Sequence, residues 1–344
     1  NMLVSVIQDQ ELRDITTECI RESQQFIRNL EEASSVSLRE TRRFVKFYDW
    51  FRQSLLTRIR PNNNKPWHYE NQLTDESEVC RRAVVLSLFI SYYLRLPDQN
   101  DRNKYLTLIL QIWKAKKSTR FETIDDLLKI FTDEQDDYLN RMTLAPGIAL
   151  NTALRENVFT LLACLVNKVP LIICGKPGCS KTLSTQLLYS HMRGPESEDP
   201  FFKSLPRLFM VGFQGSQSST SEGIEKVFDR ARRLVEESKD KNFIVMVFFD
   251  EIGLAELSKN NPLKVLHSLL EPTSCETESQ AAFVGISNWR LDASKMNRTI
   301  FLARPDPDEQ DLIKTACDIC DSYCDGASIK YRNILEALAK AYYK

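Results

Sequence analysis

The chain has 344 residues, of which 42% are hydrophobic and 27% are charged, and its formal net charge at pH 7 is −1. This composition is typical of a folded globular protein with room for two or three domains, and the balanced charge gives no electrostatic reason to expect nucleic acid or an anionic membrane as a partner. The longest apolar stretch, residues 83–94, is too short to span a membrane, which takes about 20 residues, and we expect a buried helix there.

The first part of the chain, residues 1–140, is predicted to be all-helical. All ten glycines lie at or beyond Gly147, and an absence of glycine is typical of long helices with simple connections. Apolar residues recur at helical spacing in three segments, 38–56, 104–115 and 123–131. Polar segments rich in proline and asparagine, at 61–66 and 97–101, interrupt the helical pattern.

From residue 141 onward the pattern changes. A predicted helix over 151–167 is followed by short apolar runs that alternate with helical stretches. These runs are residues 170–175, 207–213, 242–249, 282–287 and 299–303. Short apolar strands that alternate with helices predict a parallel sheet covered on both faces. The sequence therefore predicts an α/β domain preceded by an all-α region.

The segment GKPGCSKT, residues 175–182, lies where the first strand should end and the next helix begin. It nearly matches the phosphate-binding pattern G-x-x-x-x-G-K-[ST]. Lys181 could reach the β- and γ-phosphates of a nucleotide, and the Thr182 hydroxyl could ligate Mg²⁺. The expected phosphate-binding residues are Gly175, Lys176, Pro177, Gly178, Cys179, Ser180, Lys181 and Thr182. Ser180 replaces the last glycine of the pattern, and if that position needs a positive φ the serine costs on the order of 1 kcal/mol.

Two carboxylates follow the apolar run 242–249. A buried strand would deliver Asp250 and Glu251 to the edge of the sheet where ligands bind. Asp250 would then hold Mg²⁺ beside Thr182, and Glu251 would polarise the attacking water. Two acidic residues after an apolar run could instead be an ordinary helix cap.

Two further polar residues follow the next predicted strand. Asn288 ends that strand, where its amide could touch the γ-phosphate and help to position the water. Arg298 precedes the last strand and has two interpretations. It could form an ion pair or complement a helix C-terminus, or it could act as an arginine finger on the nucleotide of an adjacent module.

Four segments together resemble the AAA+ region of the mysterin family of giant RING-type E3 ubiquitin ligases. They are GKPGCSKT, FDEIGLAE, NPLKVLHSLLE and VGISNWRLDASKMNRTIF. That family carries a dynein-like array of AAA+ modules in one chain, and the resemblance covers about residues 142–305. Since the family's own loop has serine in place of the last glycine, the resemblance implies that Ser180 is a family trait.

The resemblance also implies a role for the helical first part. Residues 34–44 resemble the sensor-2 helix of an AAA+ lid, in which Arg39 would contact a γ-phosphate; the alternative is a surface arginine on a core helix. Because this lid precedes the phosphate loop, it would belong to the module before. The expected domains are therefore a preceding lid and helical connector at 1–140, an AAA+ large domain at 141–305, and the start of this module's own lid at 306–344.

The implied function is binding of ATP with Mg²⁺, and hydrolysis that drives or gates conformational change in the array. One alternative is an ATP-binding switch with little hydrolysis, and another is a module of a dynein-like or midasin-like AAA+ machine. The expected partners are neighbouring modules of the same parent chain and, through that parent, the ubiquitin machinery. No RING-type spacing of cysteine and histidine occurs here. The nine cysteines form no regular framework, which favours a reducing compartment, and we expect a cytoplasmic location.

Overall fold

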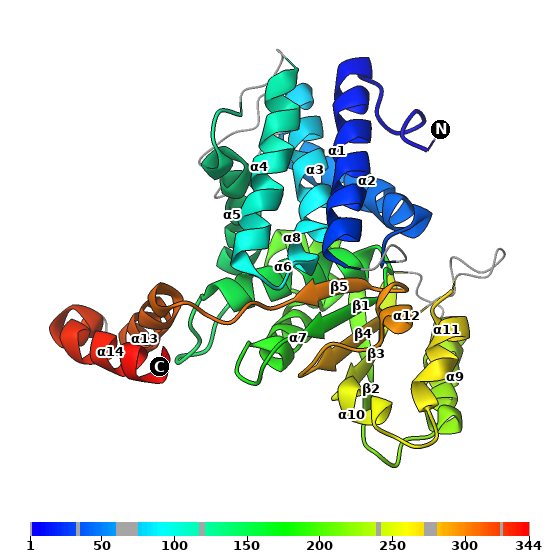
Figure 1. Cartoon of the computed structure of the whole chain (residues 1–344). Helices are drawn as coiled ribbons and strands as arrows, with labels where there is room; N and C mark the ends of the chain where they lie inside the picture. Colours follow the sequence, from blue (N-terminus) through cyan, green and yellow to red (C-terminus); the bar gives the residue numbers. More distant parts are fainter. Residues whose placement is uncertain are drawn as a thin grey trace.

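The computed structural model describes residues 2–31, 35–59, 75–116, 121–238, 242–271, 281–323 and 326–343. Figure 1 shows a helical bundle above a sheet, and a helical pair that projects from the body near the C-terminus. The break predicted at 61–66 lies outside the described residues. No helix among the described residues combines the length and the hydropathy that a membrane crossing needs.

The described part of the first 140 residues is helical, as predicted. Its helices are α1 (Gln10–Leu30), α2 (Leu38–Ile59), α3 (Glu76–Ser91), α4 (Gln99–Ala115) and α5 (Ile124–Asn140), with a 3₁₀ turn, η2 (Tyr93–Arg95), after α3. Four helices begin with a side chain that accepts a bond from a first-turn N–H group: Asp9, Asp75, Asp98 and Thr123. Helix α3 is buried on nearly every side, so the apolar stretch expected as a buried helix is its second half and the turn after it.

The second part of the chain contains a five-stranded parallel sheet. The strands are β1 (Leu171–Cys174), β2 (Arg207–Gln214), β3 (Phe243–Asp250), β4 (Ala282–Ser287) and β5 (Ile300–Ala303), in the spatial order β2-β3-β4-β1-β5. The interior strand β1 pairs on one side with β4 and on the other with β5. The predicted fold, a parallel α/β core preceded by an all-α region, is confirmed.

Alternation along the strands divides the sheet into two buried faces. One face, which includes Ile173 and Met246, packs in one continuous core with the helical bundle, α6 (Thr152–Val166) and α7 (Lys181–His191). The other face, which includes Ile172 and Val247, packs against α9 (Ser221–Glu237) and the short helices that follow it. The short elements on this second face are α10 (Ile252–Glu256), η4 (Pro262–Val265), α11 (Leu266–Leu269) and α12 (Ala293–Met296). Helix α8 (Pro200–Ser204) packs on the first face.

Buried arginines join the helical bundle to the sheet. Arg43 of α2 donates to the backbone carbonyls of Thr299 (3.0 Å) and Asn297 (3.4 Å), just before β5. In a second joint, Glu31 accepts from both Arg95 and Arg290, at 2.7 Å each.

A third joint lies at the other end of β5, where Glu156 of α6 is held between Arg102 of α4 and Arg304. Because these joints and the shared core fix α2 and α4 against the sheet, the bundle and the α/β domain form one packed body.

The C-terminal helices α13 (Glu309–Tyr323) and α14 (Ala327–Tyr343) form a pair that leaves this body (Figure 1). Several of their apolar side chains are exposed, including Tyr323 at 73% and Ile329 at 83%. A bond of 2.8 Å from the Gly147 N–H to Ser322 Oγ holds the base of the pair to the body. The pair begins close to residue 306, where the sequence predicts the start of a lid.

Candidate functional site

The predicted phosphate loop connects β1 to α7, at the edge of the sheet where the strands end. Gly175 packs so closely on Arg304 that an added Cβ would lie 2.6 Å from the Arg304 Cβ, so a larger residue does not fit. The tip of the loop, residues 176–178, is exposed, and Gly178 has a φ of +88°. The first backbone N–H groups of α7 have no acceptor within the helix, so they are available to an anion.

Ser180 has the left-handed backbone that the missing glycine would have adopted. Its φ is +53° and its ψ is +23°, and its side chain forms no cap bond to α7. The positive φ that makes serine costly at this position is therefore present. Glu251 is left-handed too, with a φ of +50°, so two non-glycine residues with strained backbones flank the same site.

We expect Ser180→Gly to raise the free energy of unfolding by about 0.5–1 kcal/mol, because glycine removes the left-handed strain but adds freedom to the unfolded chain. Urea unfolding measures the change. The matched control is Ser190→Gly, an exposed position in α7 with helical backbone, where glycine should destabilise by about 0.5–1 kcal/mol. If both variants lose stability equally, the strain at Ser180 is not real.

Asn157, which the sequence analysis missed, supports the loop from behind. It lies fully buried in α6, and its Nδ2 donates to the carbonyl of Cys179 at 2.8 Å. Arg304, also missed, supports the first residue of the loop through its contact with Gly175. The signal that could have found Asn157 is the polar run 155–157, which interrupts a largely apolar helix.

The Lys181 ammonium lies inside the loop. Its Nζ donates to the carbonyls of Gly175 (2.6 Å) and Lys176 (2.8 Å) and to Asn288 Oδ1 (3.1 Å). The residue is only 7% exposed, and burial lowers its pKa in spite of the nearby carboxylates of Asp250 and Glu251. The loop thus holds a buried cation that a phosphate group would stabilise.

Asn288 connects this lysine to the predicted base. Its Nδ2 donates to both carboxylate oxygens of Glu251, at 3.1 and 2.9 Å, while its Oδ1 accepts from Lys181. The structure therefore brings together Lys181, Asn288 and Glu251, which come from three separate segments of the chain. The amide between them fixes the direction of the Glu251 carboxylate.

Thr182 and Asp250, the predicted Mg²⁺ ligands, lie at the same edge of the sheet. Thr182 is exposed in the first turn of α7, and Asp250 ends β3, where its Oδ1 accepts from the Glu251 N–H at 3.0 Å. A hydroxyl and a carboxylate are hard oxygen donors of the kind that Mg²⁺ prefers, with phosphate oxygens and water completing the shell. Within the described residues, no group of three or more His, Cys, Asp or Glu side chains could hold a metal ion on its own.

The other loop side chains lie apart from this cluster. Cys179 is buried, and the exposed Lys176 forms an ion pair with Asp306 at 2.7 Å. Pro177 is exposed at the tip.

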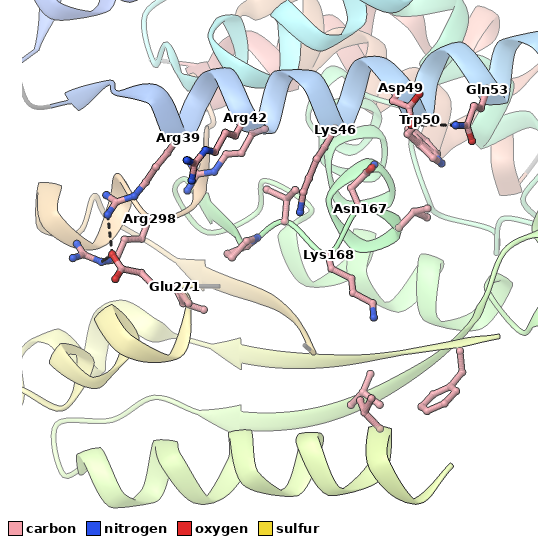
Figure 2. A pocket seen from close by; sticks show the side chains of 18 of the residues that line it. Arg39, Arg42, Lys46, Asp49, Trp50, Gln53, Asn167, Lys168, Glu271 and Arg298 are labelled. Atoms are coloured by element: carbon pink, nitrogen blue, oxygen red, sulfur yellow. Dashed lines mark hydrogen bonds and ion pairs between the residues drawn. The ribbon is translucent and has the colours of Figure 1, made fainter. Parts of the chain in front are cut away.

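Arg39 and Arg298 are not at the loop. Arg298 precedes β5, so it lies at the opposite edge of the sheet, where the strands begin. It pairs there with Glu271, with Nε and Oε1 3.4 Å apart, and Arg39 of α2 donates to the same oxygen at 2.7 Å (Figure 2). The two predicted arginines therefore converge on one carboxylate, although neither segment suggested the other.

The comparisons with known proteins match the chain to an AAA domain family and to larger relatives. A family model described as RNF213 AAA domain matches residues 147–311. The chain is 35% identical over 329 residues to the E3 ubiquitin-protein ligase RNF213 of Homo sapiens, an alignment that covers 93% of this chain and 6% of the relative. It is 35% identical over 339 residues to the ligase rnf213-beta of Danio rerio, covering 96% of this chain and 6% of the relative. The chain thus spans about 6% of the length of these curated relatives.

Proposed function

Because this chain belongs to the RNF213 AAA family through residues 147–311, as its mysterin-type motifs indicated, we propose that it binds ATP with Mg²⁺ at residues 175–182 and hydrolyses it. The observation that carries this proposal is the connected cluster of Lys181, Asn288 and Glu251 at the phosphate loop, where the strands end. A buried cation, a directed carboxylate and an amide between them are the groups that water attack on a γ-phosphate requires.

Each residue has a distinct role in this proposal. Lys181 leaves the carbonyls of the loop to contact the β- and γ-phosphates. Thr182 and Asp250 hold Mg²⁺, which neutralises phosphate charge when bound. Glu251 accepts a bond from the attacking water and draws off its proton, while Asn288 keeps that carboxylate aimed and contacts the γ-phosphate.

Arg298 and Arg39 would act on another module. Arg298 is separated from the phosphate loop by the whole of β5, and both arginines lie at the edge where the strands begin, so they cannot serve the nucleotide bound at that loop. We propose that they reach the nucleotide of the preceding module, Arg298 as its arginine finger and Arg39 as its sensor-2 residue. Their convergence supports this, because two cations for one phosphate group must lie together.

The proposed domains follow from the same reasoning. Residues 1–140 would be the preceding lid and its connector, 141–305 the large domain, and 306–344 the start of this module's lid. The buried joints of Arg43, Arg102 and Glu31 support this division, since they would make the preceding lid rigid with the large domain. The exposed apolar side of α13 and α14 supports a lid that further chain would cover.

In the parent protein, we propose that ATP turnover drives or gates movement between modules of one chain and supports a ubiquitin ligase elsewhere in it, at a cytoplasmic location. The relatives are named as E3 ubiquitin-protein ligases, which supports the second part. An ATP-binding switch with little hydrolysis is the alternative. The left-handed strain at Ser180 and Glu251 fits either role.

Calorimetric titration with Mg·ATP tests the proposal, with Lys181→Ala as the test variant. We expect at least about tenfold weaker binding by this variant, because the phosphates lose their buried cation, with little change in the melting temperature. The control is Lys203→Ala, an exposed lysine of α8, which should bind as the unmodified chain does. Equal binding by Lys181→Ala, or no binding by any folded form of the chain, would contradict the proposal.

A further inference from the structure

A cavity of about 1110 Å³ lies between α2 and the edge of the sheet where the strands begin. It extends from Arg298 and Glu271 past residues 166–170, which lead into β1, to the start of β3 (Figure 2). The phosphate loop is at the other edge of the sheet, so this cavity is separate from the proposed ATP site. It is large enough for an organic ligand of ordinary size.

The side chains around the cavity are strongly cationic. Six cations and two carboxylates line it, and three of the cations lie along one face of α2 at positions 39, 42 and 46, a spacing that aligns side chains on a helix. In Figure 2, Arg42 and Lys46 project from α2 toward the cavity. Neither forms an ion pair or hydrogen bond with any described residue. Like charges this close without counter-ions attract an anion.

The other cations differ in how they are occupied. Arg43 is already bonded within the fold, because its guanidinium pairs with Glu40 and donates to two backbone carbonyls before β5. Arg39 and Arg298 share the single carboxylate of Glu271. Because the Arg39 and Glu271 side chains are about half exposed, at 46% and 47%, water screens this pair and an anion of higher charge can displace Glu271.

We propose that this cavity is a second ligand site that binds a polyphosphate chain, with Arg42 and Lys46 as its uncommitted cations and Glu271 as the internal counter-ion that the ligand displaces. The inference extends the proposed function, because Arg39 and Arg298 belong to the same cavity. It adds two binding residues and a competing carboxylate. A triphosphate can come from a nucleotide or from free polyphosphate, and the two sources share the chemistry that these residues recognise.

The test uses tripolyphosphate and, separately, ATP as probes, titrated calorimetrically at low ionic strength, where exposed cations are least screened. The background is the full chain carrying Lys181→Ala, so that the loop does not contribute. We expect one remaining site, weakened at least about tenfold by the further pair Arg42→Ala and Lys46→Ala. Glu271→Gln should strengthen binding severalfold, because it removes the competing charge.

The matched control is Arg230→Ala with Arg233→Ala, two exposed arginines of α9 outside the cavity lining, which should bind like the background. Unchanged affinity after loss of Arg42 and Lys46, or no binding by the Lys181→Ala background, would overturn the inference. Tighter binding of ATP than of tripolyphosphate would identify a nucleotide as the source, and equal binding would identify free polyphosphate. The alanine pair tested with intact Lys181 should still bind Mg·ATP at the loop, so failure of the cavity site is distinguishable from failure of the proposed function.

Discussion

Replacing Glu156 by glutamine should lower the free energy of unfolding by about 3–5 kcal/mol, because it removes the only carboxylate between two buried guanidinium groups. Arg102 Nη1 lies 3.0 Å from Glu156 Oε1, and Arg304 binds the other carboxylate oxygen. All three residues are less than 10% exposed. Arg102 also donates to the carbonyls of Leu96 and Ala303, so it cannot move out to water without breaking further bonds.

The pH dependence of this effect has a definite sign. Burial alone would raise the pKa of Glu156, but the guanidinium groups of Arg102 and Arg304 outweigh burial and hold the pKa below its ordinary value. A carboxyl whose folded pKa is depressed stabilises the protein above its unfolded pKa, about 4.3, and this stabilisation is lost as the pH falls through the folded value. The difference in the free energy of unfolding between the unmodified chain and Glu156→Gln should therefore be constant from pH 8 to about 5 and shrink at lower pH.

Urea unfolding of the unmodified chain and of Glu156→Gln at several pH values measures both the loss of stability and its dependence on pH. The matched control is Glu222→Gln on α9, which removes an exposed pair with Lys226 and should leave stability unchanged within error. A Glu156→Gln protein as stable as the control at pH 7 would show that the buried cluster contributes nothing. Since Glu156 precedes Asn157, whose amide holds the loop, the variant should also bind Mg·ATP more weakly.

Glu251→Gln should slow ATP hydrolysis by about 10²–10⁴-fold while Mg·ATP binding persists, because the amide cannot draw a proton from water. Glutamine is nearly the same shape, and its side-chain oxygen can still accept a bond from Asn288, which now donates to both Glu251 oxygens at 3.1 and 2.9 Å. The substitution removes none of the three acceptors of Lys181, so the lysine stays in place inside the loop and remains available to the phosphates.

Single-turnover decay of bound, labelled ATP is the measurement, because it follows hydrolysis directly even when turnover is slow. Glu256→Gln is the matched control: this carboxylate is near the site in sequence but pairs with Lys295 at 2.9 Å, and its loss should leave the rate unchanged. If the unmodified chain itself retains bound ATP as long as Glu251→Gln does, the switch is the correct function and the ATPase is not.

Much of the fold could be predicted because its signals are local. The apolar runs at 242–249 and 282–287 became β3 and β4 almost residue for residue, and the loop pattern at 175–182 correctly marked the junction between β1 and α7. The short helices α10, α11 and α12 were not predicted, because four or five residues carry too little periodicity to distinguish a helix from a loop.

The candidate site also contains residues that could be predicted from local sequence and residues that could not. Lys181, Glu251 and Asn288 each follow an apolar strand, and parallel strands that end at one edge bring such residues together. Nothing local connects Arg39 with Glu271, which are 232 positions apart, or Glu156 with Arg304, which are 148 positions apart. Such partners depend on how the bundle packs on the sheet, so the sequence indicated Arg39 and Arg298 but neither Glu271 nor the Glu156–Arg304 pair.

Strand β5 connects the cationic cavity to the phosphate loop. The strand is four residues long, and it has Arg298 two positions before its first residue and Arg304 directly after its last. Only residues 300–303 are extended, so the strand separates the two arginines by its own length of about 13 Å. Arg298 pairs with Glu271 beside the cationic cavity, and Arg304 packs against Gly175, the first glycine of the phosphate loop. The two sites therefore share one strand, and any coupling carried through it would change the affinity of both sites by the same factor.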